Sequence, residues 1–314
     1  MTNRPARMWI LAAAAASVAM GSLVLLILGG RSAAPTENPC DRTLRIVSLA
    51  PSVTEIVFAL GLGDCLVGAT EHCNWPSQAK QVERVGGFGT PNMERLLALR
   101  PDLVVAAGFT RKESIEALRT AGIGVLDVRI RNFDELFAAI TDIGGETKNS
   151  SRAEALVATL RAELDAVVQR YAHIPPERRP RVFVEIWHDP LTTAGGTSFL
   201  NDLICRAGGI NVAAELPQLH PRVNPEKVLE WDPDVIVTAY MGRSGQTVSQ
   251  VAGRIGWAQI KAVRHGRIID DVPSDILLRP GPRLVEGVKT LAERLYPTSA
   301  TTVPAASVSE GACP

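Results

Sequence analysis

Short runs of aliphatic and β-branched residues alternate with longer amphipathic segments through the first half of the chain. Each short run is bounded by Pro, Gly or polar residues, which is typical of buried parallel strands. The predicted strands cover residues 44–49, 66–69, 103–107 and 125–128. A capping box at Ser52-Val53-Thr54-Glu55 predicts a helix ending at Gly61, and further helices are predicted around Glu94 and over residues 133–143. This alternation predicts a parallel sheet covered by helices on both faces.

The longest helical pattern comes next. A second capping box, Ser151-Arg152-Ala153-Glu154, begins it, and Pro175-Pro176 ends it. Between them, apolar residues recur at three- and four-residue spacing: Leu156, Val157, Leu160, Leu164, Val167, Val168 and Tyr171. About 25 residues give a rod of roughly 37 Å, which is long enough to join two lobes. The alternative is an ordinary surface helix on one large sheet.

The strand–helix pattern then starts again, which favours the joining helix. Residues 181–186 are a predicted strand, and residues 197–204 a helix that stops at Gly208-Gly209. A helix around Glu226, strands at 235–237 and 268–269, and a last helix over 282–295 follow. The fold class is therefore α/β, with two lobes, each a mainly parallel sheet flanked by helices, joined by a single long helix.

One segment occurs once in each half. Asn92-Met93-Glu94-Arg95-Leu96-Leu97, continuing to Val105, returns as Asn224-Pro225-Glu226-Lys227-Val228-Leu229, continuing to Val237. Asn as N-cap and a carboxylate in the first turn are what a helix start favours, so capping alone could explain each glutamate. Capping does not require the same residue in both halves, because Asp, Ser or Gln would serve comparably. Two matched carboxylates indicate docking onto a partner with two basic sockets.

These patterns predict the following organisation. Residues 1–40 are a signal peptide or membrane anchor with a linker, and residues 297–314 are a disordered tail. Residues 41–148 form the N-terminal lobe, residues 149–175 the linking helix and residues 176–296 the C-terminal lobe. A chain of 314 residues is long enough for two modest domains with separate cores.

The charge balance disfavours nucleic acid as a partner. Lys and Arg number 33, against 33 Asp and Glu, so no basic field is present. Arg4 and Arg7 precede an uncharged run over residues 8–30, which predicts export. Pro35 follows the small residues 32–34, so cleavage and retention as an anchor both stay open. We expect a periplasmic protein, or one tethered to the outer face of the inner membrane by residues 8–30.

Five cysteines are present, and an exported protein can oxidise them. Cys40 and Cys65 precede the first two predicted strands, so they would meet at one sheet edge, and we predict a Cys40–Cys65 disulfide. The alternative is that Cys65 and Cys205 are small buried apolar residues. Cys40 lacks a small apolar lipobox before it, so no lipid anchor is expected. Cys313 lies in the tail, where it could equally be a free thiol or form an intermolecular disulfide.

Aromatic residues are scarce, with 7 Phe, 5 Trp and 3 Tyr, yet several of them come just after predicted strands. They are Trp75, Phe88, Phe109, Trp187 and Tyr240. Ligands of open α/β sheets bind beyond the carboxyl ends of strands, and flat rings there suit a large, flat or partly apolar ligand. Any one of these rings taken alone is more simply explained as packing under a loop.

Other chemistry finds less support. His72 and His188 are not part of a cluster with metal-ligand spacing, so no metal site is predicted. The nucleophile elbow, the Walker-type lysine loop and the dinucleotide fingerprint are missing, which moves the interpretation from an enzyme to a binding protein.

Residues 43–296 resemble the cobalamin- and iron-siderophore-binding proteins of ABC importers. The resemblance rests on residues 46–55, 92–96, 100–104 and 281–284, and the first of these, with Cys73-Asn74-Trp75-Pro76, is most similar to the cobalamin branch. It implies ligand capture without catalysis and without a cofactor, cobalamin being transported cargo, by a monomer. The family's two salt-bridge glutamates fall on Glu94 and Glu226, which would meet the two subunits of an ABC permease dimer.

The resemblance places the family's ring-contacting aromatics at Phe88 and near Trp187, and together with the aromatic positions described above it gives a set of predicted ligand contacts. They are Pro51, Ser52, Trp75, Phe88, Phe109, Trp187, Tyr240 and Asp275. Phe88 stands where the family usually has tryptophan, and residues 274–277 carry aliphatics where the family has aromatics. Cys205 matches a family cysteine whose usual partner in the last helix is not a cysteine here. Ferric siderophore, haem, and zinc or manganese binding, and an exported α/β enzyme, are the alternatives.

Overall fold

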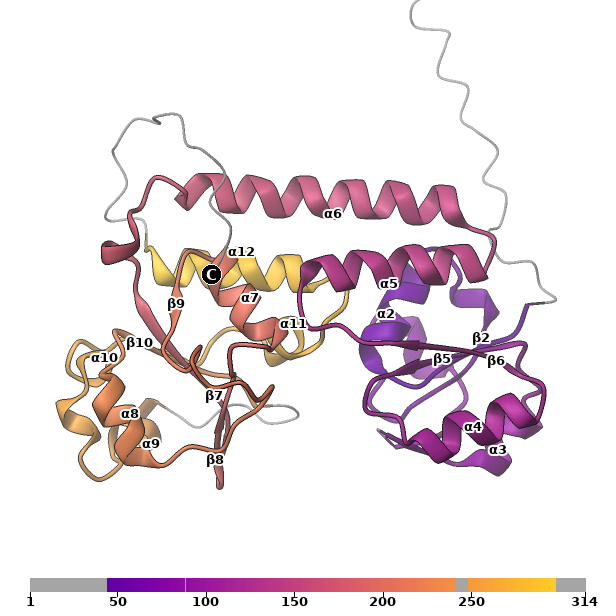
Figure 1. Ribbon diagram of the computed structural model, residues 1–314, viewed down its shortest axis with the longest axis horizontal. Helices are drawn as coiled ribbons and strands as arrows, with labels where there is room; N and C mark the ends of the chain where they lie inside the picture. The colour runs from indigo at the N-terminus through magenta and orange to yellow at the C-terminus, as the bar shows by residue number, and fades with distance from the viewer. Residues whose placement is uncertain (1–43, 88, 241–247, 298–314) are drawn as a thin grey trace, which may run out of the picture. The chain divides into compact units, whose positions relative to one another are not determined.

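The computed structural model describes residues 44–87, 89–240 and 248–297. In these residues, two parallel-rich sheets follow one another along the chain (Figure 1). The first sheet has the order β2-β1-β5-β6 and is wholly parallel, built from β1 (Ile46–Ser48), β2 (Leu66–Ala69), β5 (Leu103–Ala107) and β6 (Gly124–Val128). Each strand lies within or overlaps a run of the predicted pattern. A short antiparallel pair, β3 (Gly86–Gly87) and β4 (Thr90–Pro91), lies outside that sheet.

The second sheet has the order β11-β10-β7-β8, and β9 also pairs with β7. Its strands are β7 (Arg181–His188), β8 (Leu191–Thr193), β9 (Ile210–Asn211), β10 (Val235–Thr238) and β11 (Ile268–Ile269). Strand β7 is two residues longer than predicted, and it turns back into the antiparallel β8, which the sequence pattern did not predict. The two sheets confirm the predicted fold class of two α/β lobes.

Alternating strand residues divide the cores. In β5, Leu103 and Val105 join one core, while Val104 and Ala106 join another on the opposite face. The second face of the first sheet is covered by α3 (Met93–Ala98) and α4 (Lys112–Thr120), through Leu96, Ile115 and Leu118. Helices α2 (Pro51–Ala59) and α5 (Phe133–Glu146) pack against the first face.

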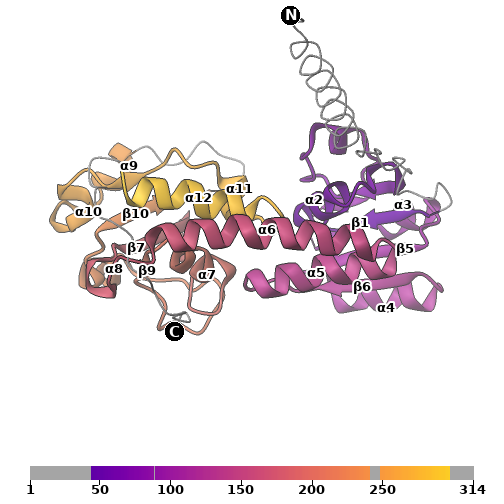
Figure 2. The ribbon, with the colours of Figure 1, turned by 90° about the horizontal axis from the view of Figure 1, so that it is seen from above.

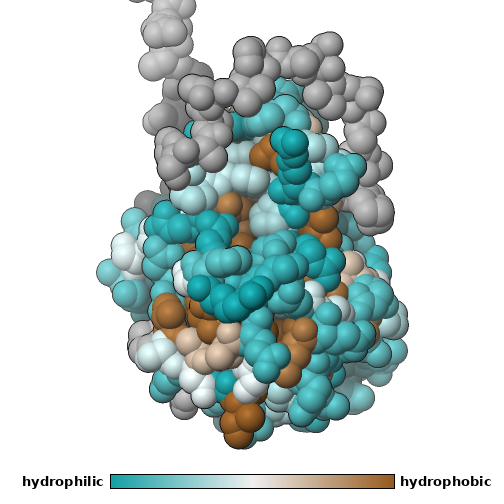
Figure 3. All heavy atoms as spheres, turned by 90° about the vertical axis from the view of Figure 1, so that its left-hand side faces the viewer, coloured by the Kyte–Doolittle hydropathy of each residue, from teal (hydrophilic) through white to brown (hydrophobic). Residues whose placement is uncertain are grey.

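The second sheet is divided in the same way. Val182 and Val184 of β7 face the large core, whereas Phe183 faces a smaller one with Val228, Trp231 and Trp257. Helices α8 (Pro225–Trp231), α9 (Val248–Ala252) and α10 (Lys261–Arg264) cover the smaller core, and α7 (Phe199–Arg206), α11 (Ser274–Leu278) and α12 (Leu284–Leu295) cover the large one. The end of this lobe is mainly hydrophilic, with separate apolar patches (Figure 3).

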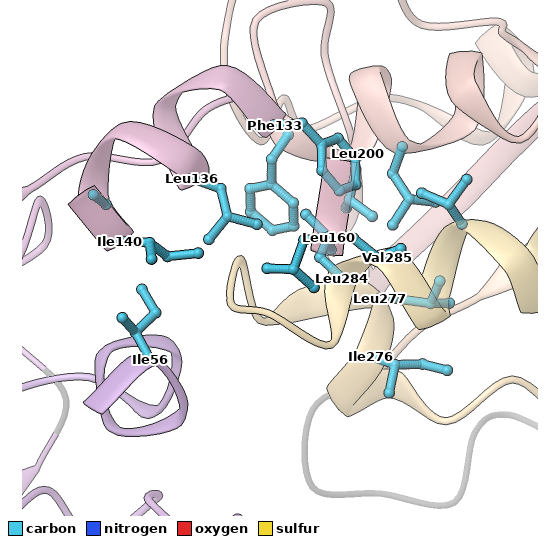
Figure 4. Close-up of a cluster of buried hydrophobic side chains, with 14 of the residues drawn as sticks. Ile56, Phe133, Leu136, Ile140, Leu160, Leu200, Ile276, Leu277, Leu284 and Val285 are labelled. Carbon is cyan, nitrogen blue, oxygen red and sulfur yellow. The ribbon is translucent and has the colours of Figure 1, made fainter. Parts of the chain in front are cut away.

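Helix α6 (Ser150–Tyr171) joins the lobes and runs beside α5 and α12 (Figure 2). Its 22 residues give a length of about 33 Å. It buries Ala153, Leu160, Leu164 and Tyr171 in the large core, which continues from Ile56 and Ile140 of the first lobe to Leu200 and Leu284 of the second (Figure 4). The lobes therefore share one core around α6 and its neighbours, and each also has a smaller core of its own on the other face of its sheet.

The two predicted capping boxes are both wrong, because neither helix has a side-chain cap at its start. Helix α6 has Asn149 as N-cap, without a side-chain cap, and Ser151 lies inside the helix. Helix α2 begins at Pro51, also without a side-chain cap, and its whole first turn apart from Pro51 is buried. Glu55 lies in this buried turn, and its carboxylate pairs with an arginine side chain and does not cap the helix backbone.

Short 3₁₀ helices complete the connections, at Gly63–Cys65, Ser77–Gln81, Pro176–Arg178 and Trp257–Gln259. Cys65 and Cys205 are each disulfide-bonded, so neither is simply a small apolar residue, while Cys73 is a buried free thiol. The predicted partner Cys40 lies outside the described residues, so the Cys40–Cys65 pairing stays a prediction.

Among the helices that the structure describes, none has the length and apolar character to cross a membrane. The predicted signal or anchor segment, Cys313 and residues 298–314 of the predicted tail lie outside the described residues.

Candidate ligand-binding site

Trp75 is the more exposed of the two tryptophans that the sequence predicts as ligand contacts, Trp75 and Trp187. It follows β2 in a segment without helix or strand, and 48% of it is exposed. The guanidinium carbon of Arg283 lies 4.3 Å from the centre of its ring, which is a cation–π distance. Arg283 is the residue just before α12, so an arginine of the second lobe holds an indole of the first.

Glu55 fixes that arginine. Its carboxylate accepts from Arg283 Nη2 at 2.8 Å and from Arg283 Nε at 3.1 Å, and Arg279 Nη1 lies 3.6 Å away. Glu55 is only 4% exposed, and burial raises its pKa above 4.5 although Arg283 and Arg279 act in the opposite direction. The sequence pattern places Glu55 in a capping box and gives no sign of its arginine partners.

Asp275 lies in α11 and not in a loop. It accepts an ion pair from Arg279 Nη2 at 2.9 Å, and Arg279 Nη1 also donates to Asn74 Oδ1 at 2.6 Å. The aliphatic residues that follow, Ile276 and Leu277, are buried in the large core. Asp275 and Trp75 are therefore brought into one group, with Asn74, Arg279, Glu55 and Arg283.

Trp187 and Tyr240 form a second group with His188. Trp187 and His188 end β7, whereas the pattern placed them after the strand. The ring centres of Trp187 and Tyr240 are 6.2 Å apart at 81°, and Trp187 is 36% exposed. Tyr240 is only 3% exposed, so it supports the tryptophan and offers little surface of its own.

A buried charge pair lies beneath this second group. Glu185 of β7 is fully buried and accepts from both terminal nitrogens of Arg254, each at 2.6 Å. The Tyr240 hydroxyl also donates to Glu185, and burial together with that carboxylate raises the pKa of the phenol well above 10. Sequence analysis did not single out Glu185 or Arg254. The available signal was one glutamate inside the apolar run Arg181–His188.

The other predicted contacts are placed as follows. Pro51 is the first residue of α2 and is partly exposed, while Ser52 is buried. Phe109 follows β5 and is 52% exposed, and its carbonyl oxygen would lie 3.0 Å from a Cβ at Gly89. The loop after β5 thus lies against the glycine-rich segment that contains Phe88. Phe88 itself lies outside the described residues.

The two repeated glutamates begin corresponding helices. Glu94 is the second residue of α3, and Glu226 is the second residue of α8; both are exposed. Asn92 caps α3 by accepting from the Arg95 amide at 3.0 Å, whereas Asn224 makes no side-chain cap. Within the described part of the chain, neither carboxylate forms an ion pair. Both helices cover the sheet face opposite the shared core.

Across residues 44–297, as far as the structure describes them, no group of three metal-binding side chains is present. The comparison with known proteins then settles the family. The family model for periplasmic binding proteins matches residues 46–274. The chain belongs to the periplasmic binding protein family.

Relatives agree with this. The chain is 37% identical over 258 residues to the uncharacterized ABC transporter substrate-binding lipoprotein YvrC of Bacillus subtilis, covering 81% of this chain and 80% of that one. The crystal structure of the periplasmic vitamin B12 binding protein of Vibrio cholerae matches with a TM-score of 0.70 at 29% identity, over 80% of this chain and 96% of that one. The apo haem-binding protein RhuT of Roseiflexus sp. RS-1 matches with a TM-score of 0.72 at 28% identity, over 81% and 98%.

This protein is therefore the substrate-binding component of an ABC transporter, and not an enzyme. The resemblance and the fold predicted from the sequence are both confirmed.

Proposed function

We propose that this ABC substrate-binding protein captures a corrinoid, cobalamin, and delivers it to its permease. The observation that carries the proposal is the presence of two exposed indole rings, Trp75 and Trp187, each held by neighbouring polar groups. A corrin ring is large and flat, and it is fringed with amide groups that both donate and accept hydrogen bonds. Asn74, Asp275 and Arg279 beside Trp75 supply both kinds of partner.

The similarity to a haem-binding protein makes haem the second candidate. Haem iron is often bound by a protein side chain, and a tyrosine is one such ligand. Tyr240 is poorly suited to this because its hydroxyl is buried and donates to Glu185. This favours the corrinoid, because the cobalt of cyanocobalamin carries its own axial ligands and needs none from the protein.

Titration of the purified protein with cyanocobalamin, haemin and a ferric hydroxamate tests the proposal. We expect saturable quenching of tryptophan fluorescence by cyanocobalamin, with the weakest response to the hydroxamate. Replacing Trp75 or Trp187 by alanine should weaken cyanocobalamin binding about tenfold each. Tighter binding of haemin, or of the hydroxamate, than of cyanocobalamin would refute the corrinoid assignment.

We further propose that Glu94 and Glu226 dock the loaded protein onto the two permease subunits. Support comes from their equivalent positions at the starts of α3 and α8, their exposure, and the absence of an ion partner among the described residues. Exposed carboxylates of this kind form bidentate pairs with arginines of a partner.

A further inference from the structure

Resting on the proposed function, we propose that Arg283 and Glu55 are positioning residues: Arg283, fixed by Glu55 across the lobe junction, holds Trp75 in the orientation in which its free face receives the ligand. Neither residue needs to touch the ligand.

Arg283 is anchored at its backbone. Helix α12 begins at the next residue, and Leu284, Val285, Val288 and Leu291 are buried in the shared core. On the other side, a Cβ at Gly281 would lie 3.3 Å from Glu55 Oε2 and from the Ser52 carbonyl oxygen. The chain therefore passes close over the start of α2 immediately before the arginine.

The guanidinium of Arg283 is oriented by a two-pronged contact with Glu55. Two of its nitrogens donate to the two oxygens of Glu55, at 2.8 and 3.1 Å. Glu55 cannot move aside, because it lies in a turn of α2 with Val53 and Ile56, which are both fully buried. The position of the guanidinium over the indole is thus set by a buried carboxylate.

Trp75 keeps about half of its surface in solvent. One face of the ring is occupied by Arg283, and the exposed surface remains for a ligand. A residue that served only to tie the lobes together would have no reason to leave a large indole exposed.

The chain contains such a tie for comparison. Arg206 of α7 lies 5.3 Å from the ring centre of Phe133 in α5, and Asp202, its ion-pair partner, also accepts from the Phe133 amide. Phe133 is fully buried. Arg206 and Phe133 thus form an arginine–aromatic pair between the lobes with no ring surface for a ligand, which makes Arg206→Gln the matched control.

The test has a part without ligand. The protein is labelled with 5-fluorotryptophan, and the ¹⁹F resonance of Trp75 is assigned with Trp75→Phe. We expect Arg283→Gln and Glu55→Gln to shift or broaden this resonance, Arg283→Lys to have a smaller effect, and Arg206→Gln to leave it unchanged. An unchanged Trp75 resonance in Arg283→Gln, in protein that remains folded, overturns the inference.

The second part uses cyanocobalamin as the probe. Arg283→Gln should weaken binding about tenfold, Arg283→Lys less, and Arg206→Gln not at all. The double variant Arg283→Gln/Trp75→Ala should bind no more weakly than Trp75→Ala, because both changes remove the same contact. Additive losses overturn the positioning role. If the unmodified protein does not bind cyanocobalamin, the proposed function fails, and the ¹⁹F result alone decides the inference.

Discussion

At the scale of single residues, two buried carboxylates organise the regions around the exposed tryptophans. Glu185 lies in β7 with no exposed surface, and Glu55 lies in α2 with almost none. Burying a lone carboxylate costs several kcal/mol, so each one depends on its arginine partners. Both pairs are therefore sensitive to the loss of one member.

Glu185→Gln should lower the free energy of unfolding by about 3 kcal/mol, because it removes the charge of a fully buried carboxylate that accepts two hydrogen bonds from Arg254. Urea denaturation measures the change. Glu146→Gln, at an exposed position of α5, is the control and should change it by less than about 0.5 kcal/mol. Replacing both Glu185 and Arg254 with methionine should recover much of the lost free energy of unfolding. A Glu185→Gln variant as stable as the unmodified protein would contradict the interpretation.

Acid should weaken a third carboxylate–arginine pair, that of Glu135 with Arg131. Arg131 donates to Glu135 through its side chain and through its backbone amide, the latter at 2.7 Å, and this holds the pKa of Glu135 below 4.5. The unfolded chain therefore binds the proton more tightly, and the stabilisation is present above pH 4.5 and lost as the pH falls through the lowered pKa.

The stability difference between the unmodified protein and Glu135→Gln should accordingly shrink as the pH is lowered from about 6 to about 3. Urea midpoints measured across that range provide the test. A difference that stays constant over the range would show that the pair does not contribute through its charge.

At the scale of elements, the contact between α5 and α6 decides how closely the linking helix packs. Gly144 of α5 is buried, and a Cβ there would collide with the Cβ of Ala153 in α6. Its neighbour Gly145 is exposed, and a Cβ there would meet nothing within 4 Å. The two glycines form a matched pair on one helix.

Gly144→Ala should lower the free energy of unfolding by about 1–3 kcal/mol through overpacking. Gly145→Ala should raise it by about 0.5–1 kcal/mol, because alanine is the better helix former. Thermal or urea unfolding of the two variants compares them directly. Equal effects would show that α6 has room to move away from α5.

Element order and type were largely predictable, because buried parallel strands and amphipathic helices leave periodic patterns in the sequence. Element ends were less so. Residues 151–154 match the capping-box sequence pattern, yet α6 begins earlier, at Ser150, and has Asn149 as its N-cap. The short strands β8 and β9 were missed because two or three residues carry no periodicity, and their pairing depends on β7 being in place.

At the scale of the whole molecule, the ligand site and the permease-docking site that we propose lie on different surfaces. The exposed indoles and the charged cluster at the lobe junction serve the ligand under the proposed function. Glu94 and Glu226 lie on helices that cover the opposite sheet faces from the shared core. The two activities should therefore be separable by mutation.

Glu94→Ala combined with Glu226→Ala should abolish uptake of cyanocobalamin by cells while changing its affinity for the purified protein by less than about twofold, since neither carboxylate belongs to the tryptophan groups. Transport assays and titrations measure the two quantities. The control Glu113→Ala with Glu163→Ala removes two other exposed charges and should leave uptake intact. Lost affinity with normal uptake would reverse the assignment.

The sequence by itself determined the alternation of strands and helices, the linking helix and the two glutamates at helix starts, because these depend on residues close together in the chain. The tertiary structure alone decided the partners of Glu55 and Glu185. Arg283 lies 228 residues from Glu55, and Arg254 lies 69 residues from Glu185. From the local sequence, a buried carboxylate looks like a helix cap or like a polar residue within an apolar strand. Its arginine partner is distant in the chain and comes close only when the chain packs into its tertiary structure.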